Sequence, residues 1–350
     1  MPATQVPFPQ VLARIARQTG LAGEEFLGKK SPAPLVTAVV GLRGDRLEPA
    51  HLALAARLPE YRPEILTKAL QEKHTLVRTW GAHGAFQVVA TADLPQQLAA
   101  AGISAPRWQR FLEARSSLAA PARLRLLKRL CPTEISKDGL KDSIPDPSTR
   151  LFMLREAAQA GHIVWKGGDG QQAVFAWAEE WLGRQVHPDR DYRVLVGRYL
   201  TAFGPVEATD LAGWLGVTIA AARKLMAKHR VVEIQVEGEP LNSFMKPEDL
   251  EKLLEVRKAQ TRGTVVIPPG DPVLHAYRGR FHPRNKEGAD DGLVYTDGRL
   301  AAVWNLGRGQ VSVQLMESAS ATRVHKLLSA LLERAGIQAE IDLTGPPAQA

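Results

Sequence analysis

Apolar and polar residues along this chain follow four successive patterns. In residues 1–100 the apolar positions recur at helical spacing and then alternate through two β-rich runs, 76–80 and 85–89. Gly81 and Gly84 separate these runs, and glycine accepts the backbone conformations of a tight turn, so we expect a hairpin. Four helices are expected before it, over residues 9–18, 34–42, 48–58 and 62–74. Helices followed by a hairpin are the order of a winged helix-turn-helix.

Two later segments repeat this order, and the last one departs from it. Residues 101–185 hold a helix over 150–160 and a second hairpin around a glycine turn at 167–170. The next segment has three helices and a strand, over 192–203, 206–215, 218–229 and 231–236. The final segment alternates short strands and then closes with a helix, over 264–267, 293–296, 300–304, 311–315 and 321–335.

These patterns predict an α+β fold with tandem winged helix-turn-helix domains and a C-terminal, small β-barrel-like domain. Three winged helices are expected, the second preceded by a basic helical segment, and the closing helix belongs to the last domain. The predicted boundaries are 1–100, 101–185, 186–262 and 263–350.

Composition narrows the class of protein. A length of 350 residues with 45% hydrophobic and 23% charged residues is ordinary for a globular protein of two to four domains. The apolar runs are too short to span a membrane, and the N-terminus lacks the layout of a signal peptide. We therefore expect a cytoplasmic protein, at the nucleoid of a bacterium, without membrane contact. Cys131 is the single cysteine and the nine histidines show no metal-binding spacing, so we expect no metal and no cofactor.

The positive charge of the chain is concentrated locally. The formal net charge is +8 and the pI is about 9.6, which favours a polyanionic partner. Contact with DNA phosphates is one interpretation of the basic segment, residues 107–129, and a solvated helix face is the other. This segment carries seven basic residues against the single acid Glu113: Arg107, Arg110, Arg115, Arg123, Arg125, Lys128 and Arg129.

Two other groups of basic residues are candidates for DNA contact. The third helix of residues 186–262 stands where a recognition helix would and carries Arg223, Lys224 and Lys228. Such a helix also occurs purely as a packing module, and this alternative stays open. Arg278 and Arg280 lie in a connection that contains glycine and proline, where a binding loop is expected. We expect double-stranded DNA as the partner and a monomeric protein.

The first hairpin carries a specific resemblance. Its sequence LVRTWGAHGAFQVV and the ADLP that follows resemble the hairpin signature of the AlkZ-like (YcaQ/AlkZ) winged-helix DNA glycosylase family, LVRTWxMRGTLHLVPAEDLP. His83 stands where the family has Arg, and Gln87 where it has His. GRYLTAFGP, IPPGDPVLHAY and LVYTDGRLAAVW are similar to further family segments in matching order. The resemblance covers most of the chain and implies DNA repair: hydrolysis of the N-glycosidic bond of alkylated purines in damaged DNA.

The family places two polar residues, Gln-x-Gln or Gln-x-Asp, upstream of an ARLP-type segment. Counting back without gaps from residues 56–59 puts Arg43-Gly44-Asp45 at that position. Asp45 keeps the carboxylate form, whereas Arg43 departs from the family. The resemblance implies a catalytic Asp45, because a carboxylate can stabilise an oxocarbenium-like sugar and act as general base for water. The alternative is a plain turn, with Asp45 near the N-cap of the next helix.

The hairpin holds the next candidates. They are His83 and Gln87. In the family the hairpin enters DNA near the lesion, which implies that His83 probes the groove or the damaged base. An exposed histidine at the hairpin tip without that role is the alternative. Four aromatic residues among apolar neighbours are predicted to be core: Trp80, Phe86, Trp214 and Trp304.

Two functions fit these observations. The first is a monofunctional DNA glycosylase that removes bulky or cationic N7-alkylated purines; the positive base weakens the bond, and no lysine stands at the motif to form a Schiff base. The second is a non-catalytic DNA-binding protein, a damage-response factor or regulator that has lost the usual motif. The enzyme requires Asp45 to be exposed on a concave surface shared with the basic segment, and a buried or oppositely directed Asp45 would exclude it.

Overall fold

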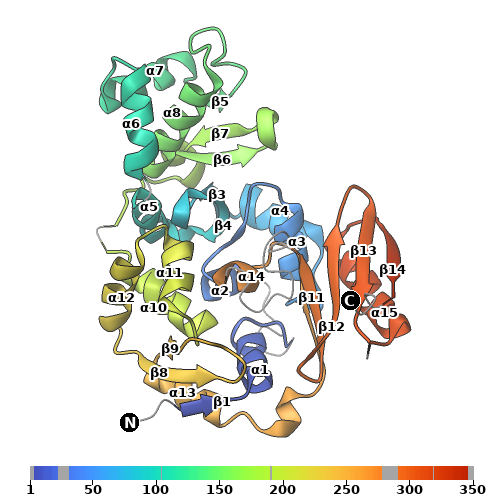
Figure 1. Ribbon diagram of the computed structural model, residues 1–350. Helices are drawn as coiled ribbons and strands as arrows, with labels where there is room; N and C mark the ends of the chain where they lie inside the picture. Colours follow the sequence, from blue (N-terminus) through green and yellow to red (C-terminus); the bar gives the residue numbers. More distant parts are fainter. Residues whose placement is uncertain are drawn as a thin grey trace.

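The computed structural model of the protein describes residues 4–22, 31–103, 105–189, 191–277, 291–317 and 319–345. Within these ranges helices and strands are interspersed and the strands form three sheets, so the mixed α+β class is confirmed. In Figure 1 the six-stranded sheet lies in the upper part, the three-stranded sheet at the lower left and the five-stranded sheet at the right. None of the described helices is long and apolar enough to cross a membrane.

The first 100 residues contain the expected helices and hairpin, with one correction. The helix expected over 34–42 ends early, because Val40 and Gly41 take positive φ values of 60° and 109° and turn the chain into a short strand. The elements are β1 Thr4–Val6, α1 Phe8–Gln18, α2 Ala33–Ala38, β2 Leu42–Arg43, α3 Glu48–Ala55, α4 Pro63–Gln71, β3 Leu76–Trp80, η1 Ala82–Gly84, β4 Phe86–Ala90, η2 Thr91–Asp93 and α5 Leu94–Gly102.

The second segment shares a sheet with the first. Its elements are α6 Ala105–Arg115, α7 Ala120–Leu130, β5 Glu134–Ser136, α8 Pro147–Gln159, β6 Ile163–Gly167, η3 Gly170–Gln172, β7 Val174–Trp177 and α9 Ala178–Leu182. The strand order is β2-β4-β3-β6-β7-β5, and Arg78 of β3 pairs with Trp165 of β6. The two hairpins, expected as separate wings, therefore form one sheet. Trp80 and Phe175 stack at this junction with ring centroids 5.7 Å apart, and both are buried, as predicted for Trp80.

The third segment folds in the expected order of three helices and a strand, and this strand, β8, pairs with β9 in a hairpin. Its elements are α10 Arg193–Phe203, α11 Ala208–Leu215, α12 Ile219–Ala227, β8 Val232–Val236, β9 Ser243–Met245, α13 Pro247–Leu254 and η4 Lys258–Thr261. The turn between α11 and α12 is tight, because Gly216 has a φ of 75° and Thr218 Oγ1 accepts a hydrogen bond from the amide of Ala221 at 3.2 Å. β1, from the start of the chain, pairs in parallel with β8, which the sequence did not indicate.

The C-terminal sheet corrects the expectation of a barrel-like domain. Its elements are β10 Thr264–Ile267, α14 Pro272–Ala276, β11 Gly292–Thr296, β12 Arg299–Leu306, β13 Gln310–Leu315, α15 Ala321–Ala335 and β14 Glu340–Thr344. The strands pair in the order β10-β11-β12-β13-β14, and within the described ranges β10 does not pair with β14. Other elements cover this open sheet: residues 301–304 of β12 are buried on both faces, and α15 packs against α3 and β14. Trp304 is a core residue, as predicted.

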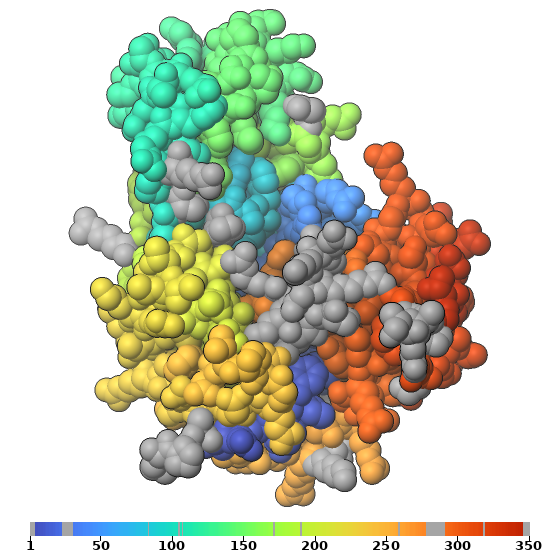
Figure 2. All heavy atoms as spheres, in the orientation of Figure 1, coloured from blue at the N-terminus to red at the C-terminus, as the bar shows by residue number. Residues whose placement is uncertain are grey.

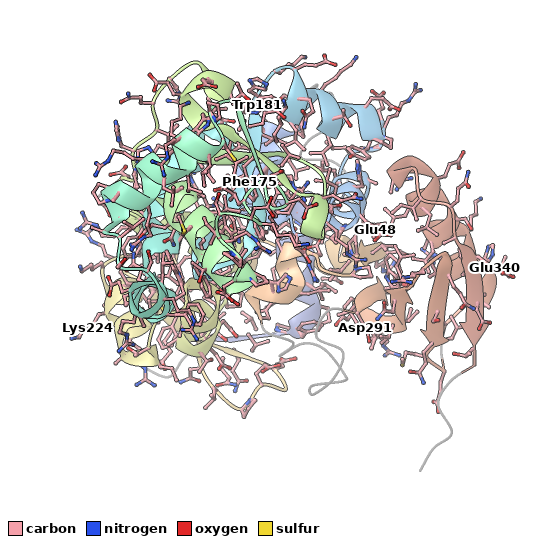
Figure 3. The ribbon with its side chains drawn as sticks, turned by 90° about the horizontal axis from the view of Figure 1, so that it is seen from above. Glu48, Phe175, Trp181, Lys224, Asp291 and Glu340 are labelled. Atoms are coloured by element: carbon pink, nitrogen blue, oxygen red, sulfur yellow. The ribbon has the colours of Figure 1, made fainter. Side chains whose placement is uncertain are left out.

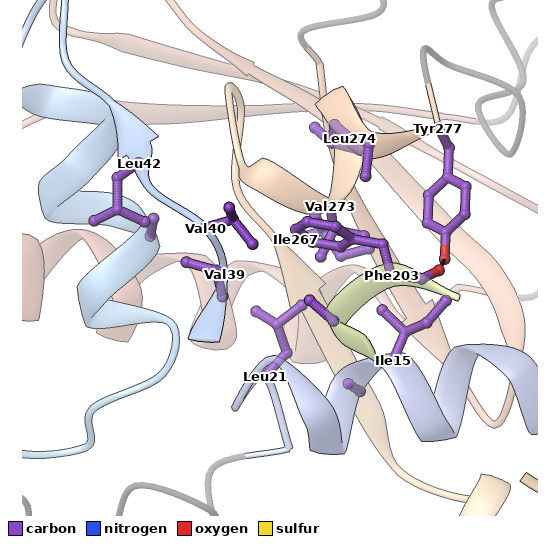
Figure 4. Close-up of a cluster of buried hydrophobic side chains, with 14 of the residues drawn as sticks. Ile15, Leu21, Val39, Val40, Leu42, Phe203, Ile267, Val273, Leu274 and Tyr277 are labelled. Carbon is purple, nitrogen blue, oxygen red and sulfur yellow. Dashed lines mark hydrogen bonds between the residues drawn. The ribbon is translucent and has the colours of Figure 1, made fainter. Parts of the chain in front are cut away.

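One hydrophobic cluster joins parts of the chain that are far apart in sequence. Figure 4 shows Ile15 of α1, Val39 after α2, Phe203 at the end of α10 and Val273 of α14 close together. The hydroxyl of Tyr277 donates a hydrogen bond to the carbonyl of Phe203. This cluster sets α14 beside α2 and α10, while Figure 2 shows the second segment, in green, projecting from the body that the other segments form.

Candidate active site

The motif at residues 43–45 is held against the first hairpin. Leu42 and Arg43 form β2 and pair with Val88 and Gln87 of β4. The amide of Gly44 then donates to the carbonyl of Phe86 at 2.9 Å. A Cβ atom at residue 44 would lie 2.6 Å from the carbonyl carbon of Gln87, so only glycine allows this approach. The motif is therefore not a free turn: its position follows from strand pairing with the hairpin.

Asp45 is a partly exposed carboxylate that accepts two hydrogen bonds from Arg43. Arg43 Nε donates to Asp45 Oδ1 at 2.7 Å and Arg43 Nη2 donates to Oδ2 at 3.1 Å, and the Asp45 side chain is 43% exposed. Partial burial opposes ionisation of Asp45, but the hydrogen bond and the charge of Arg43, together with hydrogen bonds from the backbone of Arg46 and Asp45, outweigh it, so its pKa lies below the ordinary value of an aspartate. Asp45 is therefore ionised at neutral pH.

Asp45 and Arg43 line a cavity of about 650 Å³. Four parts of the chain form its walls: the motif, the first hairpin with Phe86 and Gln87, α11, and α14. The Gln87 side chain lies between Gly41 and Gly81, its Oε1 atom 3.3 Å from the position that a Cβ of Gly41 would take. The structure thus brings together three residues selected from the sequence, Arg43, Asp45 and Gln87, and adds walls that local sequence did not indicate.

Trp214 of α11 was expected in the core, and this prediction is wrong because the residue is only half-buried and lines the cavity. Its ring lies against Tyr199, with centroids 4.7 Å apart, and the Tyr199 hydroxyl donates to the carbonyl of Ala276 at 2.7 Å. Phe86, also expected in the core, is half-buried and lines the same cavity. It packs on Trp80, with ring centroids 4.0 Å apart. Aromatic rings at a cavity wall suit contact with a flat, apolar ligand surface.

α14 contributes His275 and Leu274 to the cavity wall. A buried ion pair holds the start of this helix. Arg57 and Asp271 are both 0% exposed, and the guanidinium donates to the two carboxylate oxygens at 2.6 and 2.8 Å. Asp271 also caps α14 by accepting from the amide of Val273 at 2.9 Å. His275 was missed from the sequence; the only signal was a polar side chain within the family-like segment IPPGDPVLHAY.

Comparison with known proteins decides the family. The family model described as DNA glycosylase AlkZ-like matches residues 36–344, which run from α2 to the end of β14. The chain belongs to the AlkZ-like DNA glycosylase family. Among solved structures it is similar to Streptomyces sahachiroi DNA glycosylase AlkZ, with 18% identity and a TM-score of 0.72 over 97% of this chain and 100% of that chain. At that identity the likeness shows a shared fold. No curated protein matches the chain.

The hairpin turn of this AlkZ-like chain adjoins the helix-turn-helix of the third segment. His83 belongs to η1, and its side chain lies outside the described part of the structure. η1 packs against α11, the helix that carries Trp214. Arg223 and Lys224 are exposed on α12, and Figure 3 shows Lys224 at one edge of the molecule, while Phe175 lies well inside.

None of the described residues of the basic segment lines the cavity. Its helices α6 and α7 lie at the far end of the molecule in Figure 1. Asp45 is thus partly exposed at a cavity, but the surface shared with the basic segment that was expected for the enzyme is not found among the described residues: the motif and the basic segment do not line one pocket.

Residues of the basic segment differ in their surroundings. Arg123 is buried and donates to both carboxylate oxygens of Glu156, at 2.8 and 2.6 Å. Lys128 pairs with Glu180 at 2.7 Å and lies over the ring of Trp177. The remaining described members face solvent: Arg110, Arg115, Arg125 and Arg129. The Arg107 side chain, Arg278 and Arg280 lie outside the described residues.

Proposed function

We propose that this protein is a monofunctional DNA glycosylase that hydrolyses the N-glycosidic bond of N7-alkylated, cationic or bulky purines in duplex DNA. Membership of the AlkZ-like DNA glycosylase family supports base excision in general. The observation that carries the proposal is Asp45, an ionised carboxylate at the wall of a cavity of about 650 Å³. The cavity also has the aromatic walls that a purine would contact.

In the proposed reaction the alkylated base leaves with the electron pair of the bond to C1′ and so becomes neutral. The sugar develops positive charge, which the Asp45 carboxylate stabilises. Water attacks C1′ and its proton passes to Asp45 or to solvent, which leaves an abasic site. Because the pKa of Asp45 is lowered, its negative charge contributes more than its basicity.

Arg43 has two effects in this scheme. Its two hydrogen bonds hold the Asp45 carboxylate in one orientation. Its positive charge lies next to that carboxylate and so weakens the attraction between Asp45 and a sugar cation. A base that is already cationic needs less stabilisation on leaving. This site therefore suits activated, N7-alkylated bases better than neutral ones.

DNA contacts are proposed on three surfaces of a tandem winged-helix scaffold. The first is the hairpin, with His83 and Gln87. The second is α12, with Arg223 and Lys224, which packs on α11 beside that hairpin. The third is the solvent-facing part of the basic segment. We propose that the protein acts as a monomer on chromosomal DNA in the cytoplasm.

The decisive test is release of base from duplex DNA that contains N7-methylguanine. Asp45→Asn should lower the single-turnover excision rate by about 10²-fold or more with nearly unchanged DNA affinity, since the charge acts on the transition state. Asp191→Asn is the matched control, because Arg193, two residues away, donates to both carboxylate oxygens of Asp191 in an exposed pair of the same kind. Equal excision by wild type and Asp45→Asn would contradict the proposal.

A non-catalytic DNA-binding protein is the second candidate. The observation that favours it is the clamp by Arg43, which engages both oxygens of Asp45. Absence of base release by the wild type from N7-alkylated duplexes, together with retained duplex binding, would favour this function.

A further inference from the structure

A second arginine, Arg78 of β3, contacts the backbone of the motif. Its side chain is only 4% exposed. Its Nη2 and Nε atoms donate to the carbonyl of Gly44 at 2.7 and 3.1 Å, and Nη2 also lies 3.4 Å from the carbonyl of Asp45. β2 ends at Arg43, so these carbonyls lie beyond the last paired residue of the strand. The guanidinium therefore donates to these two carbonyls the hydrogen bonds that a neighbouring strand would otherwise donate.

The same guanidinium reaches the turn of the second hairpin. Arg78 Nη2 donates to Asp169 Oδ1 at 2.7 Å, Nη1 lies 3.4 Å from the carbonyl of Gly168, and the group lies 4.0 Å above the ring of Trp165. Burial lowers the pKa of Arg78, and the hydrogen bond and charge of Asp169 counteract this, so the group remains protonated. One buried cation therefore connects the motif with a turn about 125 residues later in the chain.

The geometry requires arginine specifically. A planar guanidinium offers several donors in a rigid fork, whereas a lysine ammonium at the end of a flexible stem cannot reach the same set together. The carbonyl of Gly44 belongs to the peptide group that leads into Asp45. Fixing that group fixes the direction in which the Asp45 side chain leaves the backbone.

We propose that Arg78 is a positioning residue: it orients the peptide groups of Gly44 and Asp45 so that the carboxylate faces the cavity, and it ties this orientation to the turn at Gly168 and Asp169 of the second hairpin. The effect of Arg78 on base excision rests on the proposed function, whereas its effect on the order of the motif is independent of that function. The second hairpin, none of whose described residues lines the cavity, thereby takes part in building the site.

The test compares Arg78→Met, Arg78→Lys and Asp169→Asn with a matched control, Arg150→Met. Arg150 is also buried and donates to two backbone carbonyls, those of Ile144 and Pro145, outside the cavity. Arg78→Met should slow single-turnover excision by on the order of 10²-fold, because a displacement of about 1 Å at a reacting group has that effect. Its DNA Kd should stay within about twofold of wild type, as expected for a residue that acts through Asp45.

Two of the variants separate positioning from general stability. Arg78→Lys should recover only part of the rate, and Asp169→Asn, which keeps the bonds to Gly44, should lose less than Arg78→Met. If Arg78→Met does not fold, these two variants carry the comparison. Excision rates reduced equally by Arg78→Lys and Arg150→Met, or DNA affinity that falls in parallel with rate, would overturn the proposal.

A second readout does not need activity. Hydrogen exchange at residues 42–48, followed by mass spectrometry, should accelerate in Arg78→Met or Arg78→Lys and stay unchanged in Arg150→Met. Faster exchange at the motif without any excision by the wild type would leave the positioning role in place and reject the glycosylase function. Unchanged exchange at the motif would reject the positioning role itself.

Discussion

The buried ion pair between Arg57 and Asp271 gives a direct test of how the cavity wall is held. Both side chains are 0% exposed, and Arg57 also donates to the carbonyls of Thr19 and Ala53, at 2.7 and 2.9 Å. Arg57→Met keeps much of the volume but leaves the Asp271 carboxylate buried without its cation. Removal of one partner of such a pair costs about 3–5 kcal/mol. We expect the upper part of this range, because two backbone carbonyls lose their donor as well.

Urea unfolding followed by tryptophan fluorescence measures this loss as a decrease in the free energy of unfolding. The control is Asp191→Asn, which breaks an exposed pair and should leave the unfolding midpoint nearly unchanged. The double variant Arg57→Met, Asp271→Leu should regain part of the stability, since it leaves no lone buried charge. It should not regain all of it, because the cap on α14 is gone. A loss below about 1 kcal/mol for Arg57→Met would refute the conclusion that this pair holds α14 in place.

Two further predictions concern Arg43 and the basic segment. Arg43→Gln should hold or raise excision at neutral pH, because it removes a cation beside the forming sugar cation. The change should also move the acid limb of the pH–rate profile upward. In the wild type the hydrogen bond and charge of Arg43 help to hold the pKa of Asp45 below its ordinary value, whereas without Arg43 only hydrogen bonds from the backbone of Asp45 and Arg46 oppose the effect of burial, which raises the pKa. An acid limb that stays in place or moves down would contradict this assignment. Replacing Arg110, Arg115 and Arg125 with Gln should flatten the dependence of log K on log salt by about 0.9 for each DNA phosphate that the protein no longer neutralises, measured by fluorescence anisotropy on duplex DNA. Arg123→Gln is the comparison, because Arg123 is engaged with Glu156 and should change stability more than the salt slope; an unchanged slope in the triple variant would identify a solvated helix face.

Sequence alone predicted those features of this protein that depend on nearby residues. The closing helix was expected over 321–335, where α15 lies, and the first hairpin was expected at the residues of β3 and β4. The turn between α11 and α12 followed from Gly216 and Thr218, which act on their immediate neighbours. Family membership also followed from sequence, because the hairpin signature is a continuous run of residues. Periodicity, capping and turn chemistry are local, and local patterns survive in a single sequence.

Tertiary structure decided what depends on contacts between distant residues. β2 is only two residues long and exists because β4 lies beside it, whereas the apolar run at 34–42 by itself is typical of one helix. The same holds for the union of the two hairpins in one sheet, for the open C-terminal sheet, and for β1 pairing with β8. Trp214, His275 and Arg78 acquire their places at or behind the cavity only when α11, α14 and β3 pack around the motif. The sequence shows the types of these residues. The strand pairing and packing that bring them to Asp45 act between residues up to about 230 positions apart, and no local sequence pattern indicates such contacts.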